Sequence, residues 1–418
     1  IAGAASAIFA PYDIGNVHVD AYDVVDNKPK TSAYRAPGAP NVVYATESII
    51  DEIAERLGMD PIDFRLRNAA REGTRRSDGV VNGRIGAQEI MEAVKAHPHY
   101  SATLDGKYRG RGIGMGFCRN NTGMSCVVAN VLSNGTVALV EGSVDIGGTR
   151  TAVAQQLAEV LGIPVENVNP QVADTDTIGY TSNTGGSGVA FKTGWAAYEA
   201  AHDIIRQLIQ RTTLLWETSS DLLEYVNGVI YHKSNPEAHV SFKEIAGMLS
   251  ETGGPVVGRA NLNPAGSGGS YSANIVDVEV DHETGKVTIL RCTAFQDVGT
   301  AIHPSYVEGQ MQGGTAQGIG WALNEEYCMD VNGRMLNTSL LDYRMPTSLD
   351  LPMIEPVVIE VPNPGHPFGV RGVGEANIVP PLAAIANAIY RAIGVRMNAL
   401  PMCPVAVQKA IENVGSDE

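Results

Sequence analysis

The sequence predicts an α+β protein with mixed sheets and flanking helices, because it combines β-hairpin signals with amphipathic helical runs. In two places, alternating apolar runs flank a short polar turn: residues 125–132 with 136–144, and 273–280 with 286–295. Apolar residues recur at the helical period in 151–161, 189–210, 304–323 and 381–393. No segment repeats at a fixed period, which argues against a solenoid or a propeller.

The N-terminal residues predict one strand followed by helices. Residues 17–26 alternate apolar and polar side chains, which indicates a half-buried strand. A helix is expected at 41–57, because its apolar side chains fall on one face and Gly58 follows it. Asp60-Pro61 begins a second, short helix, since proline is favoured in a first turn.

A polar and basic stretch indicates a domain boundary. Residues 71–110 contain only a short helical pattern near 88–94. We therefore expect one domain at 1–105 and a second at 106–418.

The composition is that of a globular, acidic chain. Of 418 residues, 46 are acidic and 30 are Lys or Arg, which gives a formal charge of −16. The absence of a basic run disfavours a nucleic-acid or anionic-membrane surface, and no apolar run reaches the ~18 residues of a membrane span. We expect a soluble, cytoplasmic protein that binds neither nucleic acid nor membrane.

The cysteines and the first residues add two expectations. Five cysteines stand at wide spacings without a C-x-x-C pair, so we expect buried structural thiols rather than disulfides, zinc ligands or iron–sulfur ligands. The first residues lack an initiator Met and the regions of a signal peptide. We expect either that the sequence begins inside a longer chain or that the chain is one piece of a larger unit.

Glycine is concentrated in loops that precede or open predicted helices. It accounts for 46 of 418 residues, and the loops are 147–151, 181–188, 309–314 and 369–375. Backbone N–H groups at helix starts can bind anionic or acceptor-rich ligands, and glycine lets such ligands approach closely. None of the loops has a P-loop or dinucleotide-binding pattern. Each loop alone is consistent with a tight turn, whereas four together favour a large polar ligand.

Glu375 is the main candidate for chemistry. It ends the glycine loop 369–375 and precedes the apolar helix expected at 381–393. Apolar neighbours would partly bury this carboxylate, and burial makes a carboxylate a stronger base. The alternative is a carboxylate that only stabilises a helix N-terminus. The local sequence leaves both interpretations open.

Seven sequence blocks carry a resemblance to a known family. They are AYRAPGAP (33–40), EIAERLGMDPIDFRLRN (52–68), GSVDIGGTRTAVAQQLAEVLGIP (142–164), ADTDT (173–177), TSNTGGSG (181–188), VEGQMQGGTAQGIGWAL (307–323) and GVRGVGEANIVPPLAAIANAI (369–389). In this order they resemble the C-terminal part of the molybdopterin-binding subunit of the xanthine dehydrogenase and aldehyde oxidase family, the molybdenum hydroxylases. The resemblance implies the molybdopterin-binding domains of that family and an oxidoreductase activity.

The resemblance also implies roles for individual residues. Glu375 matches the family's glutamate beside molybdenum, which acts as general base while water supplies the oxygen. The residues that match cofactor-binding positions are Tyr34, Arg35, Ala36, Gly147, Gly148, Thr149, Gly185, Gly186, Ser187 and Gln317. The family holds molybdenum through the dithiolene sulfurs of the pterin, so no residue of this chain is expected to ligate the metal.

Two departures from the family pattern bear on the site. The family's Gly-Gln-Gly motif is Ile146-Gly147-Gly148 here, so glycine replaces a glutamine near the polar tail of the cofactor. The N-terminal half of the family's subunit has no counterpart, nor do its Fe–S and flavin portions. We therefore expect a second molybdopterin polypeptide with the missing half, separate Fe–S and FAD subunits, and a dimer of such heteromers. The chain most resembles the large molybdopterin subunit of nicotinate dehydrogenase, in which this unit is split into two chains.

The resemblance implies hydroxylation of an aromatic N-heterocycle, with nicotinate to 6-hydroxynicotinate as first choice. Such a substrate needs a cation or hydroxyl for its carboxylate and apolar walls for its ring. The candidates are Tyr12, Phe368 and Arg371, while His366 is expected in a turn. Tyr12 is also consistent with a core residue and Arg371 with an ion-pair partner. The expected cofactor is molybdenum with molybdopterin in its cytosine dinucleotide form, with a terminal sulfido or selenido ligand.

Other functions stay open at this point. Within the family, the alternatives are oxidation of a purine or an aldehyde, and reduction of an aromatic thioester. Outside it, the alternative is a catalytically silent scaffold that binds partners without a cofactor.

Overall fold

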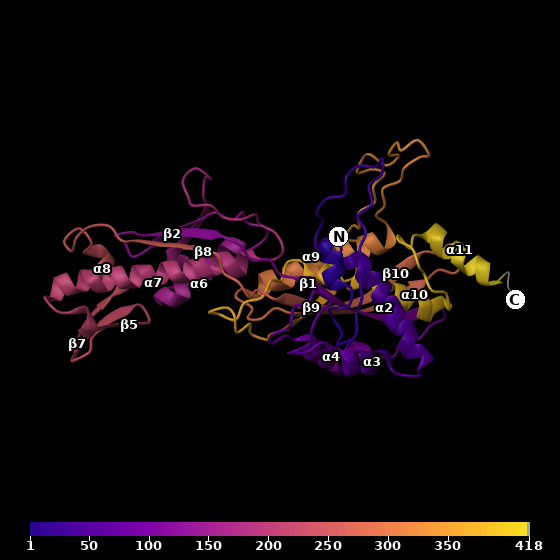
Figure 1. Cartoon of the computed structure of the whole chain (residues 1–418), viewed down its shortest axis with the longest axis horizontal. Coiled ribbons are helices and arrows are strands. Elements are labelled where there is room, and N and C mark those ends of the chain that lie inside the picture. The colour runs from indigo at the N-terminus through magenta and orange to yellow at the C-terminus, as the bar shows by residue number, and fades with distance from the viewer. Residues whose placement is uncertain (416–418) are drawn as a thin grey trace.

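The computed structural model describes residues 1–415, and it shows two bodies joined end to end (Figure 1). The first body contains residues 1–119 and 269–415. The inserted body contains residues 120–268, because the chain leaves the sheet of the first body and later returns to it. Within the described residues, no helix is both long and apolar enough to cross a membrane.

The first body is built on a four-stranded sheet in the order β1-β9-β10-β11. Its strands are β1 (Arg109–Arg119), β9 (Gly269–Val280), β10 (Val287–Asp297) and β11 (Ile354–Ile359). The pairs β1/β9 and β9/β10 are antiparallel, whereas β10/β11 is parallel. The hairpin predicted from 273–280 and 286–295 is therefore confirmed as β9 and β10.

Helices cover both faces of this sheet. The helices of the first body are α1 (Ala2–Ala7), α2 (Ala39–Arg56), α3 (Pro61–Asn68), α4 (Ala87–Ala96), α5 (Pro98–Ser101), α9 (Pro304–Leu323), α10 (Pro381–Ile393) and α11 (Pro404–Gly415). On one face, Val276 of β9 shares a core with Ile319 of α9 and Ile385 of α10. On the other face, Phe117 of β1 shares a core with Met91 of α4. The sheet is thus the middle of three layers.

Helix α10 lies directly on β1, because glycine occupies alternate positions of that strand. These glycines are Gly110, Gly112, Gly114 and Gly116. A Cβ on Gly112 would overlap the carbonyl oxygen of Ala384 and the backbone nitrogen of Ala388 in α10. Alternating glycine therefore permits a close helix–strand contact that any side chain would prevent. The loop that carries Glu375 runs into this fixed helix.

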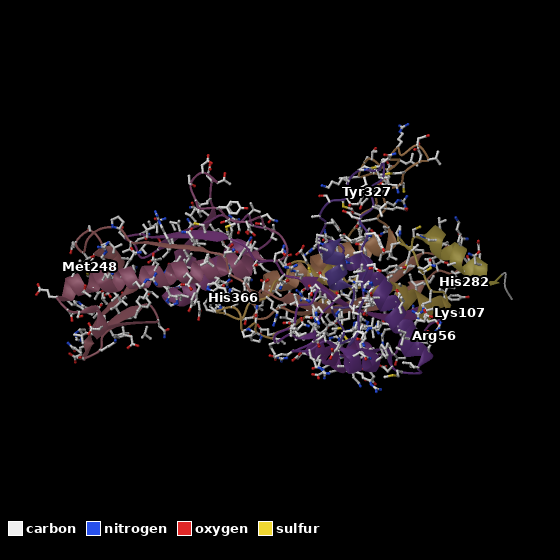
Figure 2. The ribbon with its side chains drawn as sticks, viewed as in Figure 1. Arg56, Lys107, Met248, His282, Tyr327 and His366 are labelled. Atoms are coloured by element: carbon white, nitrogen blue, oxygen red, sulfur yellow. The ribbon has the colours of Figure 1, made fainter. Side chains whose placement is uncertain are left out.

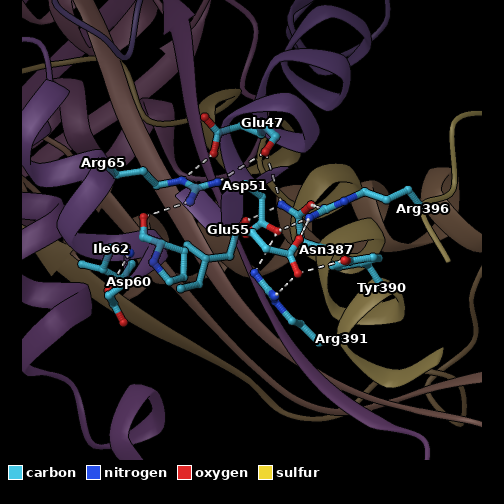
Figure 3. A network of polar contacts seen from close by, with 12 residues as sticks. Glu47, Asp51, Glu55, Asp60, Ile62, Arg65, Asn387, Tyr390, Arg391 and Arg396 are labelled. Atoms are coloured by element: carbon cyan, nitrogen blue, oxygen red, sulfur yellow. Dashed lines mark hydrogen bonds and ion pairs between the residues drawn. The ribbon is translucent and has the colours of Figure 1, made fainter. Parts of the chain in front are cut away.

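A polar network joins α2 to β1 and α10 (Figure 3). Glu47 of α2 accepts hydrogen bonds from Nε of Arg65 at 2.9 Å and from the backbone N–H of Met115 at 2.8 Å. Further along α2, Oδ2 of Asp51 pairs with Nη2 of Arg396 at 3.0 Å. Since Glu47 and Arg65 are almost fully buried, each charge depends on the other for compensation.

The inserted body has a mixed sheet in the order β4-β3-β2-β8, with two helices on one face. Its elements are β2 (Ser125–Val131), β3 (Val137–Glu141), α6 (Thr149–Leu161), β4 (Val168–Val172), α7 (Val189–Trp216) and β8 (Val257–Leu262). A small sheet and a helix lie at the far end (Figure 1): β5 (Leu223–Val226), β6 (Val229–His232), β7 (Asn235–Ser241) and α8 (Phe242–Gly247). The predicted hairpin of 125–132 and 136–144 is confirmed as β2 and β3.

The other predicted elements are confirmed with one exception. The helices expected at 41–57, from Asp60-Pro61 and at 151–161 are α2, α3 and α6. The strand expected at 17–26 is wrong, because these residues pair with no strand among those described and their side chains are mostly exposed. Alternation forms a strand only where a neighbouring strand satisfies its backbone groups.

The structure also bears on the expected domain boundary and on the cysteines. The boundary between 1–105 and 106–418 stays a prediction, but helices before residue 105 share a core with β1 and β9. Three of the five cysteines are buried as expected, whereas Cys328 is exposed and Cys403 is half-buried. The expectation of buried thiols is therefore wrong for Cys328, which lies in an irregular loop.

Candidate active site

Glu375 lies where the two bodies meet. Its Oε1 accepts a hydrogen bond from the backbone N–H of Ala36 at 3.1 Å, and its Oε2 accepts one from Oγ of Ser187 at 3.0 Å. Glu375 precedes a short 3₁₀ turn, η3 (Ala376–Ile378), but its side chain caps no N–H group of that turn. Both side-chain oxygens therefore bond to distant segments rather than to the start of this turn.

Arg35 fixes the segment that carries Ala36. Its Nη1 donates to Oε1 of Gln317 at 3.1 Å, its Nη2 donates to Oε1 of Gln310 at 2.8 Å, and its Nε donates to the carbonyl oxygen of Gly374. Burial lowers the pKa of Arg35, and the nearby carboxylate of Glu375 opposes that change. The structure thus brings Arg35, Ala36, Gln317 and Glu375 together. The neighbouring Tyr34 is half-exposed and packs edge-on against Trp321.

The glycine loop 181–188 presents Ser187 to Glu375. Ser187 and Gly186 adopt left-handed backbone angles, with φ of 54° and 59°. The backbone N–H of Asn121 donates to the carbonyl oxygen of Gly186 at 2.7 Å. A Cβ on Gly186 would overlap the side chain of Asn121, so glycine is required for this close approach. The loop is therefore held against a segment of the inserted body that follows β1.

Lys192, in the first turn of α7, anchors the other end of that loop. Its Nζ donates to the carbonyl oxygens of Ser182 at 2.9 Å and of Asn183 at 3.0 Å. Burial lowers the pKa of Lys192. The sequence analysis missed this residue, since a lysine within a helix gives no local signal that it turns back to bind a loop.

Asp145 bonds to backbone and side-chain groups at the N-terminus of α6. Its Oδ1 accepts hydrogen bonds from the N–H groups of Gly147 at 2.9 Å and Thr149 at 3.0 Å, and its Oδ2 accepts one from Nε of Arg150 at 3.0 Å. Partial burial raises the pKa of Asp145, but these hydrogen bonds outweigh it and lower the pKa to about 2. Two N–H groups of this predicted cofactor loop are thus bonded within the loop itself.

An open cavity of about 710 Å³, including the part exposed to solvent, lies between the bodies. The starts of α6, α7 and α9 and residues 370–374 border it. Of the predicted site residues, those that line it are Gly147, Gly148, Thr149, Gly185, Ser187 and Arg371. Gln310 also lines it, and the sequence analysis missed this residue. Gln310 precedes Gln317 by two helical turns, so both lie on one face of α9, which is a signal that could have found it.

The three predicted substrate residues are not brought together. Tyr12 is buried and its hydroxyl donates to Glu47, so it lies in the core of the first body and does not line the cavity. Nε of Arg371 pairs with Oδ2 of Asp297 at 3.1 Å, and both side chains are buried. The core and ion-pair interpretations are therefore the ones observed. As a correction, Tyr12 is not positioned to bind substrate.

Phe368 belongs to an aromatic cluster beside α7. Its ring packs edge-on against Tyr198 at 5.6 Å between centroids, and Phe368 does not line the cavity. His366 is buried between the bodies (Figure 2), and its Nε2 lies 3.1 Å from the carbonyl oxygen of Phe191 in α7. Burial lowers the pKa of His366 to about 4. His366 therefore acts as a neutral link between the bodies, in addition to its expected place in a turn.

Comparison with known protein families fits this geometry. The sequence pattern of the molybdopterin cofactor-binding domain matches residues 87–352, and a second pattern with the same description matches residues 1–69. The chain belongs to the molybdopterin-binding domains of the xanthine dehydrogenase and aldehyde oxidase family. The predicted fold class and family are both confirmed.

Members of this family match most of the chain. The xanthine dehydrogenase molybdenum-binding subunit of Escherichia coli O157:H7 is 33% identical over 90% of this chain and 53% of that subunit. The nicotine 6-hydroxylase large subunit of Paenarthrobacter nicotinovorans is 29% identical over 96% of this chain and 54% of that subunit. The crystal structure of quinoline 2-oxidoreductase from Pseudomonas putida 86 has a TM-score of 0.81 at 26% identity, over 91% of this chain and 53% of that one. The chain spans about half the length of the curated relatives it matches.

The residues that line the cavity fit a molybdopterin group. Gly374 lies beside two polar groups that line the cavity, since a Cβ on it would stand at ordinary contact distance, 3.5 Å from Oε1 of Gln310 and 3.6 Å from Oγ of Ser187. Hydroxyl and amide groups of this kind match the many hydrogen-bonding atoms of a pterin. Within residues 1–415, no group of three or more His, Cys, Asp or Glu side chains could hold a metal ion.

Proposed function

We propose that this chain is the molybdopterin-binding part of a molybdenum hydroxylase that hydroxylates an aromatic N-heterocycle with water as the oxygen source. The observation that carries the proposal is the position of Glu375, which is bonded on both oxygens and directly follows Gly374, a residue that lines the cavity. The names of two relatives, nicotine 6-hydroxylase and quinoline 2-oxidoreductase, support an N-heterocycle. Nicotinate, converted to 6-hydroxynicotinate, is the specific substrate we propose.

The chain's own residues would position and deprotonate the attacking water. When bound, the molybdenum cofactor supplies a Lewis acid that lowers the pKa of water and a sink for two electrons. Glu375 receives the proton, because the single donors Ala36 and Ser187 leave each oxygen with capacity for a further bond. Arg35 and Gln317 hold the segment of Ala36 in place, and Gly147, Gly148 and Gly185 border the cavity that would receive the pterin.

We further propose the cytosine dinucleotide form of the cofactor with a terminal sulfido or selenido ligand. The resemblance to bacterial molybdenum hydroxylases supports the nucleotide. Mass spectrometry of the nucleotide released from the purified protein, with selenium analysis of the same sample, tests both points. Release of another nucleotide, or of none, would contradict the dinucleotide.

We propose that a second molybdopterin polypeptide, an Fe–S subunit and an FAD subunit complete the enzyme, as a dimer of heteromers. The structure offers a surface for such partners in two projecting loops, residues 13–35 and 325–353 (Figure 1). Their apolar side chains are exposed to an unusual degree: Val25 at 95%, Leu341 at 89% and Leu349 at 95%. Exposed apolar patches of this kind favour burial against another polypeptide.

The replacement Glu375→Gln tests the proposed reaction. Because Gln cannot accept a proton, we expect turnover of an N-heterocycle to fall by about 100-fold or more, while the molybdenum and pterin contents stay unchanged. Glu308→Gln, an exposed change on α9, serves as the control and should keep full turnover. A complex with no molybdenum and no pterin would refute the proposal, and full activity of Glu375→Gln would remove this residue from the mechanism.

Oxidation of a purine is the second candidate, because the first-named relative is a xanthine dehydrogenase subunit. A screen of nicotinate, xanthine, aldehydes and an aromatic thioester with molybdenum-loaded enzyme separates the substrate classes. A scaffold without cofactor would give no turnover and no molybdenum.

A further inference from the structure

Gln310 bonds to two segments of the site that are far apart in the sequence. It lies in the second turn of α9 and lines the cavity. Its side-chain oxygen accepts a hydrogen bond from Nη2 of Arg35 at 2.8 Å, and its side-chain nitrogen donates to the carbonyl oxygen of Ile146 at 3.2 Å. One amide group therefore joins the loop before α6, in the inserted body, to the arginine beside Glu375.

The geometry of both loops accommodates this amide. Gly147 has a φ of 110°, and a Cβ at this position would lie 2.8 Å from the side-chain nitrogen of Gln310. Glycine therefore leaves the space that the amide occupies. On the other side, Arg35 also bonds to the backbone carbonyl oxygen of Gln310 at 3.1 Å, so the guanidinium is held by two atoms of one residue.

Ala36 follows Arg35 directly and donates its N–H to Glu375. Ala36 has a φ of 54°, a left-handed conformation that an alanine adopts only when its surroundings hold it there. Loosening Arg35 would let this backbone relax and would weaken the bond to Oε1 of Glu375.

We propose that Gln310 is a positioning residue that couples the loop Ile146-Gly147-Gly148 to Arg35, and that it thereby fixes the direction in which the Glu375 carboxylate faces. This inference deepens the proposed function and rests on it for the role of Glu375. The coupling needs a donor and an acceptor on one side chain. Glutamate would keep the bond to Arg35 and lose the bond to Ile146, and methionine would lose both.

Backbone hydrogen exchange of the full chain separates the two bonds. We expect Gln310→Met to speed exchange about five- to tenfold in peptides that cover 33–38 and 144–150, because each loses a hydrogen bond that holds it. Gln310→Glu should speed exchange only in 144–150. Gln312→Met is the matched control, since Gln312 lies on the same helix and its amide bonds instead to the carbonyl oxygen of Ile354. Unchanged exchange in 33–38 for Gln310→Met, or equal changes for Gln312→Met, would overturn the proposal.

A second readout uses the assembled enzyme. Gln310→Met should lower kcat about tenfold with KM and molybdenum content unchanged, and Gln310→Glu should lower kcat by a smaller factor, because it keeps the bond to Arg35 and loses only the bond to Ile146. An equal loss in both variants would contradict the coupling through Arg35. The exchange experiment needs no turnover, so failure of the coupling and failure of the proposed hydroxylation are distinguishable.

Discussion

Glu47 in the first body and Glu141 in the inserted body are both carboxylates that are at most 1% exposed, yet their surroundings differ completely. Glu47 accepts hydrogen bonds from Arg65, Tyr12 and the backbone N–H of Met115. Neither oxygen of Glu141 has a hydrogen-bond partner among the described residues. Burial raises the pKa of Glu141 to about 8, and the nearby Asp145 adds to this.

The comparison shows that two equally buried carboxylates can differ completely in the groups that replace water around them. A buried carboxylate stays ionised when a cation and N–H donors replace water, and it becomes neutral when nothing replaces water. Glu375 has one hydrogen-bond donor on each oxygen, and the residue before it, Gly374, lines the open cavity. Each oxygen of Glu375 therefore keeps capacity for a further hydrogen bond.

The replacement Arg65→Met removes the ion pair with Glu47 and should have the largest effect on stability. It leaves the charge of Glu47 buried without its cation, so we expect unfolding to become easier by about 3–5 kcal/mol. Urea unfolding of the purified chain at pH 7 measures the loss. The double replacement Arg65→Met with Glu47→Leu should recover part of it, and no recovery would mean that packing rather than charge dominates.

Gly112→Ala and Gly194→Ala compare the stability lost when an added Cβ meets backbone with the stability lost when it meets a side chain. An added Cβ on Gly112 meets the backbone of α10, which cannot move, so we expect a loss of about 3 kcal/mol. Gly194→Ala in α7 is the matched change, because the three atoms nearest to its added Cβ belong to the side-chain amide of Gln156. Thermal unfolding of the two variants should give the larger decrease for Gly112→Ala, and equal decreases would contradict the role of the α10 contact.

Glu141→Gln tests the carboxylate that has no hydrogen-bond partner among the described residues. It should have the smallest effect of the three replacements, and it should stabilise the chain where the other two destabilise it. The pKa of Glu141 is higher in the folded chain than the ordinary 4.5, so the native protein is increasingly disfavoured as pH rises from about 4.5 to about 8. Glutamine cannot ionise, and we expect it to stabilise the chain by roughly 1–3 kcal/mol at pH 8 and by little at pH 4. Unfolding curves at both pH values measure the difference, and a gain of equal size at both would show that ionisation is not the cause.

Much of the local structure could be predicted from the sequence. The hairpins, the helices at 41–57 and 151–161, and the helix from Asp60-Pro61 depend on patterns of neighbouring residues, and the structure contains them. The strand expected at 17–26 failed because pairing depends on a neighbour that the pattern does not specify. Tyr12 failed as a substrate residue because its partners, Glu47 and Arg65, come from two other helices.

The sequence by itself determined the elements, the glycine-rich loops and the family, since each depends on short motifs in a fixed order. Only the tertiary structure decided which loops meet: Glu375 bonds to Ala36 and Ser187, which lie 339 and 188 positions away. It also decided that Gln310 bonds to both Arg35 and Ile146, and that Arg371 forms an ion pair with Asp297. The physical reason is that hydrogen bonds and ion pairs act over a few ångströms in space, whatever the separation along the chain.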